Sequence, residues 1–326
     1  MNWSGKKVLI TGGLGFIGSN LAIRLVGEGA IVAVTDAKIE GYGGNEANLA
    51  EVRGQVEIHL SDVRDESAMA ELVTGVDVIF HLAAQVSHVM SLSNPYPDID
   101  INIKGTAALL EACRKRNPAA ILIRSGTRGQ YGPAVKLPVA EDAPSDPRGL
   151  YEISQLSAEM ICRAYHRIHN ICIVPLRLTN VYGPRAQMRH SHFGVVNWFV
   201  RLALEGRPIP IFGSGRLVRD FLYVDDCVEA LVRAAEEPAA AGEILNVGHD
   251  RASTFLEVAE ILCELVPGTT IEFTDFTPER KAQEPGDFLS DITKIRRILS
   301  WEPVVGLREG LSRTVDFYRE RRGDYF

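Results

Sequence analysis

The sequence predicts an α/β fold in which a doubly wound parallel sheet carries a smaller mixed α/β lobe. Over the first half of the 326-residue chain, short apolar segments alternate with segments of helical periodicity, the pattern of a parallel sheet covered by helices. The first apolar segment runs directly into a glycine-rich turn. After residue 180 the alternation gives way to loops rich in glycine, proline and charge, which indicates a second, less regular lobe.

The expected strands are short and almost continuously apolar, as strands buried on both faces are. They comprise residues 7–11, 30–35, 56–60, 76–81, 120–125 and 172–178. The helices expected between them comprise residues 19–28, 66–73, 103–116 and 150–169. In the second lobe, helices are expected at 195–205 and 254–266 and a strand at 209–212.

This order suggests a division of the chain into two parts. We expect residues 1–179 to form the sheet domain, with a later segment of about 220–248 returning to it. Residues 180–219 and 249–326 would form the smaller lobe. Ligands of open α/β sheets bind beyond the carboxyl ends of the strands, so a lobe placed there would make a cleft.

Composition excludes several classes of protein. The net charge is −7, which argues against nucleic acid or an anionic membrane as the main partner, and the basic run at 114–116 is interpreted as a solvated helix end. The five cysteines are dispersed, as in reduced cytosolic proteins, and no spacing suggests a metal site; His190 and His192 are interpreted as solvated. The early first strand leaves no room for a signal peptide, and no apolar run approaches membrane-spanning length, so a cytoplasmic location is expected.

The glycine turn is the strongest single motif. Gly12, Gly15 and Gly18 lie three residues apart between an expected strand and helix, where bare backbone N–H groups can bind a pyrophosphate. Alone the motif also fits an ordinary turn, but here it has the Rossmann context. Asp36 ends the second expected strand, where a carboxylate would accept hydrogen bonds from ribose hydroxyls and repel a 2′-phosphate, which favours NAD over NADP.

Further cofactor contacts are expected at the ends of the next two strands. Asp62 and Val63 follow the third strand and could flank the adenine. Leu82, Ala83 and Ala84 follow the fourth strand, and their small size leaves room for the pyrophosphate and the nicotinamide side.

Ordered motifs along nearly the whole chain carry a resemblance to a known family. They are TGGLGFIG at 11–18, DVRD at 62–65, HLAA at 81–84, NIKGT at 102–106, YG at 131–132, LRLTNVYGP at 176–184, RDFLYVDD at 219–226 and NVG at 246–248. With these motifs the chain resembles the extended short-chain dehydrogenases/reductases, in particular nucleotide-sugar epimerases and dehydratases such as UDP-glucose 4-epimerase. The resemblance implies further cofactor contacts from Phe16, Ile17, Asn102, Ser125, Tyr151 and Gln155, substrate contacts from Gln85 and Ser87, and a homodimer formed through helices 103–116 and 150–169 as a four-helix bundle.

The expected catalytic helix departs from that family. Tyr151 and Gln155 lie at i and i+4 on one helix face, where the family has Tyr-x-x-x-Lys. There the tyrosine is the general base and the lysine lowers its pKa and binds the nicotinamide ribose. An ordinary tyrosine titrates near 10, so Gln155 leaves two alternatives: a weaker base or a substituted cation, or attenuated catalysis.

The segment before Tyr131 carries a further catalytic position. The resemblance assigns Thr127 the hydroxyl that donates to the substrate oxygen. The next two positions hold an acidic pair in the 4,6-dehydratases but are Arg128 and Gly129 here, which removes support for dehydration by that route. Arg128 either points into the site as a replacement cation or lies on the surface.

The smaller lobe contributes the expected substrate contacts. By resemblance, Asn180 holds the diphosphate, Phe212 stacks on the base and Arg219 pairs with phosphate, a bond to which the planar guanidinium is suited. A later family arginine is Glu284 here, which would repel a pyrophosphate unless Arg280 and Lys281 substitute for it. Three residues of the loop after Asn180 either contact the sugar or lie in a surface loop: Arg185, Arg189 and His190.

These observations favour an NAD-dependent epimerase acting at C4 of a nucleotide sugar. Transient oxidation and re-reduction at one carbon need Tyr151 and Thr127 but no dehydratase acid. Two alternatives stay open: a dehydratase or dehydrogenase of the same superfamily with a rearranged acid, and an NAD-bound protein with a binding or regulatory role, which Gln155 and Glu284 would explain.

Overall fold

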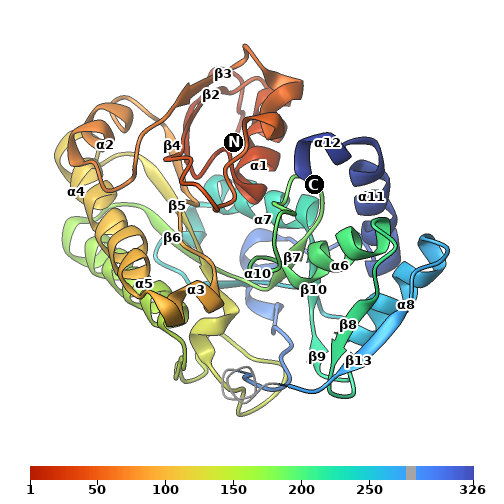
Figure 1. Ribbon diagram of the computed structural model, residues 1–326. Coiled ribbons are helices and arrows are strands. Elements are labelled where there is room, and N and C mark those ends of the chain that lie inside the picture. Colours follow the sequence, from red (N-terminus) through yellow and green to blue (C-terminus); the bar gives the residue numbers. More distant parts are fainter. Residues whose placement is uncertain (277–283) are drawn as a thin grey trace.

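A computed structural model of the chain describes residues 1–276 and 284–326. Its centre is a parallel seven-stranded sheet with the strand order β11-β6-β5-β4-β1-β2-β3 (Figure 1). The strands are β1 (Lys7–Thr11), β2 (Ile31–Thr35), β3 (Val56–His59), β4 (Val78–His81), β5 (Ile121–Thr127), β6 (Ile173–Leu178) and β11 (Leu245–Val247). The doubly wound parallel sheet predicted from the sequence is confirmed.

Helices cover both faces of the sheet. They are α1 (Phe16–Gly27), α2 (Glu66–Leu72), α3 (His88–Ser93), α4 (Thr106–Arg116), α5 (Leu150–His169) and α7 (Val224–Glu236). Alternation along β1 shows the two layers: Val8 and Ile10 pack in one core with Leu21 of α1, whereas Leu9 packs in another with Leu109 of α4 and Cys162 of α5. In Figure 1 the layer of α2, α4 and α5 lies to the left of the sheet.

The smaller lobe lies beyond the carboxyl ends of the strands, on the right side of Figure 1. Its helices α6 (Val195–Leu204), α8 (Phe255–Leu265) and α11 (Leu307–Glu320) pack on one another, and α12 (Arg322–Tyr325) follows α11. Helix α10 (Thr293–Leu299) packs instead on α7 and β11 of the sheet domain. Its strands pair in twos: β7 (Asn180–Tyr182) with β10 (Phe221–Tyr223), β8 (Ile209–Phe212) with β13 (Ile271–Thr274), and β9 (Val218–Arg219) with β12 (Ser253–Thr254). Between these segments, α7 packs against α1 and β11 extends the main sheet.

Local structure differs from expectation at two helix starts. The first helix begins at Phe16 rather than residue 19, directly after its N-cap residue, Gly15. The helix expected from 103 begins only at Thr106, since Asp98–Gly105 forms a π-helical segment. Short 3-10 helices comprise Glu46–Val52, Arg128–Tyr131 and Pro238–Ala240. Among the described residues, no helix combines the length and apolar character needed to cross a membrane.

Candidate active site

A large cavity opens at the carboxyl edge of the sheet. Its volume is about 820 Å³. One wall carries residues that end or follow β1, β4 and β5, including Thr11, Leu82 and Thr127, and the opposite wall carries Phe212 and Arg219 from the smaller lobe. This is the edge at which open α/β sheets bind ligands.

The glycine turn presents backbone to the cavity. Gly12 has a φ of +70°, and a Cβ atom there would lie 2.8 Å from the Ala83 nitrogen, so only glycine fits. A side chain on Gly18 would collide with the Gly12 carbonyl oxygen, which explains how α1 packs so closely on the turn. Gly15 caps α1 without a side-chain acceptor, and no acidic residue lies in the first turn, so the helix N-terminus is available to an anion.

Asp36 lines the cavity next to the glycine turn. Its carboxylate accepts hydrogen bonds from the backbone nitrogens of Lys38 (2.9 Å) and Leu14 (3.3 Å). Burial raises the pKa of Asp36, and those two hydrogen bonds oppose the shift. Asp62 accepts two hydrogen bonds from the Arg64 side chain and a third from the Arg64 backbone nitrogen, and these keep the pKa of Asp62 below its ordinary value.

Most of the expected cofactor residues therefore lie together. The predicted residues that line this cavity are Gly12, Gly15, Phe16, Ile17, Gly18, Asp36, Asp62, Val63, Leu82, Ala83, Ala84, Ser125, Tyr151 and Gln155. A bare helix N-terminus, a glycine cradle and a carboxylate after β2 suit the pyrophosphate and ribose of an adenine dinucleotide.

Three predicted contact residues lie behind the cavity wall instead. The Asn102 side chain bonds both backbone groups of Gln85 and the Ser154 hydroxyl. The Gln85 amide bonds Asp98, and the Ser87 hydroxyl caps α3 by accepting from the Met90 nitrogen. All three side chains are buried and none lines the cavity, so they hold the loop after β4 in place.

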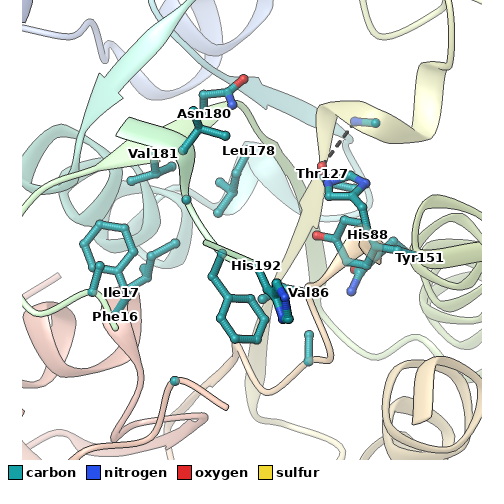
Figure 2. A pocket seen from close by; sticks show the side chains of 18 of the residues that line it. Phe16, Ile17, Val86, His88, Thr127, Tyr151, Leu178, Asn180, Val181 and His192 are labelled. Atoms are coloured by element: carbon teal, nitrogen blue, oxygen red, sulfur yellow. Dashed lines mark hydrogen bonds between the residues drawn. The ribbon is translucent and has the colours of Figure 1, made fainter. Parts of the chain in front are cut away.

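Tyr151 and Thr127 lie close together in one wall of the cavity. Tyr151 begins α5 and is 8% exposed, while Thr127 is the last residue of β5. Figure 2 shows both side chains on one side of the pocket, with Phe16 and Ile17 across from them. The pKa of Tyr151 is raised above its ordinary value, because burial and the neighbouring Glu152 charge outweigh the Thr127 hydroxyl and the Arg124 charge, which lower it.

A buried cation stands beside Gln155. The Arg124 guanidinium donates a 2.5 Å hydrogen bond to Gln155 Oε1, and Arg124 is only 2% exposed. Because this bond engages the amide oxygen, the amide nitrogen of Gln155 is left to donate elsewhere. Arg124 was not predicted as a site residue, since an arginine inside a predicted strand belongs to no motif. The only sequence signal was the missing lysine at position 155, which left open that another cation takes its place.

A histidine–glutamate pair lies next to Tyr151. His88 Nδ1 is 2.6 Å from Glu152 Oε1, and the His88 ring meets the Tyr151 ring edge to face at 4.8 Å between centroids. All three residues line the cavity. Neither His88 nor Glu152 was predicted as a site residue, although both adjoin residues that were.

The expected substrate residues form a charged group at the far end of the cavity. Arg128 lines the cavity, donates a 2.9 Å hydrogen bond to Asn180 Oδ1 and lies over the Phe288 ring. Burial, together with the charge of Arg219, lowers the pKa of Arg128 to about 10. Arg128 thus points into the site and does not lie on the surface, which was the other alternative.

Arg219 is already paired. Its guanidinium bonds the Glu284 carboxylate and the carbonyl oxygens of Val218 and Gly286 (2.7 Å each). Both partners of the ion pair line the cavity, as does Phe212, which lies 5.6 Å from Phe276 between ring centroids. The substitutes considered for the missing arginine, Arg280 and Lys281, lie outside the described residues.

The loop after Asn180 turns its basic residues away from the cavity. Arg185 bonds Asn20 and Glu51, and His190 bonds the Gly41 carbonyl oxygen. Neither they nor Arg189 line the cavity, whereas Gln187 and His192 of the same loop do. No cluster able to hold a metal ion occurs in the part of the chain that the structure describes.

Comparison with known proteins gives a consistent result. Residues 8–248 match the family model described as the NAD dependent epimerase/dehydratase family. The chain is 34% identical to the UDP-glucose 4-epimerase of Mycolicibacterium smegmatis, over 97% of this chain and 99% of that protein. It is 32% identical to the UDP-N-acetyl-alpha-D-glucosaminuronate decarboxylase of Bacillus cytotoxicus, over 98% and 99% of the two chains.

The fold agrees with solved structures of this group. The dTDP-glucose 4,6-dehydratase DesIV of Streptomyces venezuelae, solved with NAD bound, superposes with a TM-score of 0.87 at 30% identity, covering 97% of this chain and 98% of that one. These relatives catalyse different reactions but share one fold and a nucleotide-sugar substrate class. The chain therefore belongs to the NAD-dependent epimerase/dehydratase family, with NAD as its cofactor and an extended short-chain dehydrogenase/reductase fold.

Proposed function

We propose that this protein is an NAD-dependent epimerase that inverts a nucleotide sugar at C4. The observation that carries the proposal is the meeting of Tyr151 and Thr127 at the cavity, beside a buried cation. Relatives in the family act on nucleotide sugars by several routes, and 4-epimerisation is the route that needs the fewest further groups.

In this proposal Tyr151 takes the proton of the sugar hydroxyl and later returns it. Thr127 donates a hydrogen bond to the same oxygen and fixes its position. NAD, when bound, supplies reversible oxidation of the sugar carbon. Arg124 favours the ionised tyrosine, and the Gln155 amide that it orients donates toward the ribose or the tyrosine.

The far end of the cavity would hold the nucleotide diphosphate. Phe212 offers a ring for base stacking, and Arg128 with Asn180 offers donors for phosphate. Glu284 offsets the charge of Arg219, so this end is less cationic than two arginines would make it. We therefore expect weaker diphosphate binding than two unpaired arginines would give.

A non-catalytic role is the second candidate, because Gln155 and Glu284 both depart from the family pattern. Two observations weigh against it: Tyr151 and Thr127 are retained, and the buried Arg124 guanidinium bonds Gln155 at the position of the family's lysine. The surrounding geometry thus supports an enzyme with altered charges.

The experiment is to release and identify the nucleotide bound by the purified protein, then to offer UDP-glucose, UDP-N-acetylglucosamine and dTDP-glucose. We expect bound NAD and an inverted sugar, read by proton NMR. Bound NAD with neither inversion nor a keto product from any of these sugars would reject the enzyme and favour the binding role.

We also propose a homodimer built through α4 and α5. Ile153, Met160 and Ile168 project from α5 as exposed apolar side chains at helical spacing, a pattern typical of a helix that packs against a partner. Sedimentation velocity of the wild type and of Met160→Glu checks this: we expect a dimer and a weakened dimer, and a monomeric wild type would contradict it.

A further inference from the structure

The His88–Glu152 pair is a built feature of the cavity that the proposed 4-epimerase does not use. His88 is 54% exposed and faces the cavity, whereas the Glu152 carboxylate behind it is 14% exposed. The pair is joined through Nδ1, and within residues 1–276 and 284–326 no hydrogen bond engages His88 Nε2. Figure 2 shows the His88 ring beside Thr127 and Tyr151.

Two glycines make room for the Glu152 side chain. A Cβ atom on Gly129 would lie 2.6 Å from Glu152 Cγ, and one on Gly149 would collide with Glu152 Oε2. Any larger residue at 129 would therefore displace Glu152. The Glu152 side chain thus occupies the space beside Gly129 that a side chain at position 129 would need.

Charge also favours an ionised carboxylate here. Burial alone would raise the pKa of Glu152, but the hydrogen bond and charge of His88 bring it below its ordinary value. Glu152 Oε2 is buried and has no hydrogen-bond partner among the described residues, so the carboxylate relies on His88. A carboxylate hydrogen-bonded to Nδ1 orients the imidazole and leaves Nε2 toward the cavity.

We propose that His88, oriented by Glu152, is a second acid–base group that moves a proton on the sugar carbon next to the one oxidised. This rests on the proposed function for the substrate class, a nucleotide sugar, and adds a proton transfer that plain 4-epimerisation does not contain. It makes the site able to exchange the proton on a carbon beside a ketone.

The step balances without a further reactant. A C–H bond beside a carbonyl is acidic, because the electron pair left behind passes into the carbonyl as an enolate. The proton goes from carbon to His88 Nε2, and the ring keeps its Nδ1 hydrogen bond to Glu152. The reverse transfer places a proton back on the same carbon from the same face, and restores the ketone and the neutral imidazole.

The test supplies the ketone directly, so that it requires no redox chemistry. The wild-type protein, with its bound nucleotide, is incubated in D₂O with the 4-keto-6-deoxy derivative of dTDP-glucose, and proton NMR follows the hydrogens on the two carbons beside the ketone. We expect one of them to exchange far faster than without protein. In His88→Asn the exchange should fall on the order of 10²-fold or more, as for loss of a general base.

The variants separate the histidine from its partner. Glu152→Gln keeps the shape but not the charge, so its exchange rate should lie between those of the wild type and His88→Asn. His59→Asn is the matched control: His59 is also paired with a glutamate, Glu57, at 3.1 Å, but it does not line the cavity, and the exchange should be unchanged. Bound nucleotide, measured after denaturation, checks that each variant is folded.

Two results would overturn the proposal: a wild-type exchange no faster than the protein-free solution, or an unchanged rate in His88→Asn. The proposed function fails separately. A protein that does not invert any nucleotide sugar can still exchange the added ketone, and a true 4-epimerase can leave it untouched.

Discussion

The two ends of the cavity were assembled differently. At the cofactor end, each group stands where the sequence pattern places it: Gly12 and Gly18 at the turn, and Asp36 after β2. At the end where the sugar would react, the family's lysine is replaced by Gln155 and the acidic residue of the dehydratases by Gly129. Arg124 donates a hydrogen bond to Gln155, and the Glu152 side chain occupies the space beside Gly129. The comparison teaches that a charge can be kept while the residue that bears it changes.

The largest expected effect comes from removing the Tyr151 hydroxyl, the proposed proton acceptor. Tyr151→Phe removes the proton acceptor but keeps the ring, so turnover should fall on the order of 10³-fold. The NAD content of the purified protein should stay close to the wild-type level, because the glycine turn, Asp36 and the Tyr151 ring are all retained. A variant that still turns over at a tenth of the wild-type rate would show that another group is the base.

The next effect tests whether Arg124 replaces the missing lysine. In Arg124→Met the pKa of Tyr151 should rise, since a charge that lowers it is gone. One pKa unit corresponds to about tenfold less ionised tyrosine, and turnover at neutral pH should fall by about that factor. In a plot of rate against pH, the rising limb should move to higher pH. An unmoved limb would show that Arg124 does not replace the missing lysine.

Gln155→Lys sharpens the same test. In the wild-type background it places an ammonium against the buried Arg124 guanidinium, and like charges in a buried site should destabilise the fold. Combined with Arg124→Met, it should recover turnover lost in Arg124→Met alone. Thermal unfolding and turnover of the single and double variants provide the cycle.

At the cofactor end we expect a change of preference rather than a loss. Asp36→Ala removes the acceptor for ribose hydroxyls and the repulsion of a 2′-phosphate, so the affinity ratio of NAD to NADP should fall about tenfold or more. Tryptophan quenching or calorimetry with the nucleotide-free protein measures both constants. An unchanged ratio would mean that the carboxylate does not meet the ribose.

The smallest expected effect is at the substrate phosphates. Glu284→Gln removes the charge that offsets Arg219, so KM for a nucleotide sugar should fall a few-fold while kcat stays nearly constant. A matched change away from the cavity, Glu272→Gln on the exposed face of β13, should leave both constants alone. A rise in KM would indicate that Glu284 positions Arg219 for the substrate.

Much of the fold followed from periodicity, because parallel strands buried on both faces have a distinctive apolar pattern. Leu150–His169 and Lys7–Thr11 were predicted to the residue. The helices α7 and α11 were missed, since they lie in the less regular half, where strong β/α alternation no longer marks them.

The site was predictable where a backbone motif defines it and not where packing does. Tyr151, Thr127 and Asp36 come from local motifs, and all three line the cavity. Arg124 and His88 carry no motif; they reach the site because β5 and α3 both pack against α5, which is a property of the tertiary structure. Conversely, Asn102 belongs to a motif but is used to fix a loop.

The position of Arg124 inside the sheet has a consequence for how this enzyme can change. Its charge lies within electrostatic range of the buried Glu159 and Arg177, which form an ion pair of 2.7 Å on α5 and β6. Because Arg124 is almost fully buried in the central sheet, a substitution there should lower thermal stability as well as the rate.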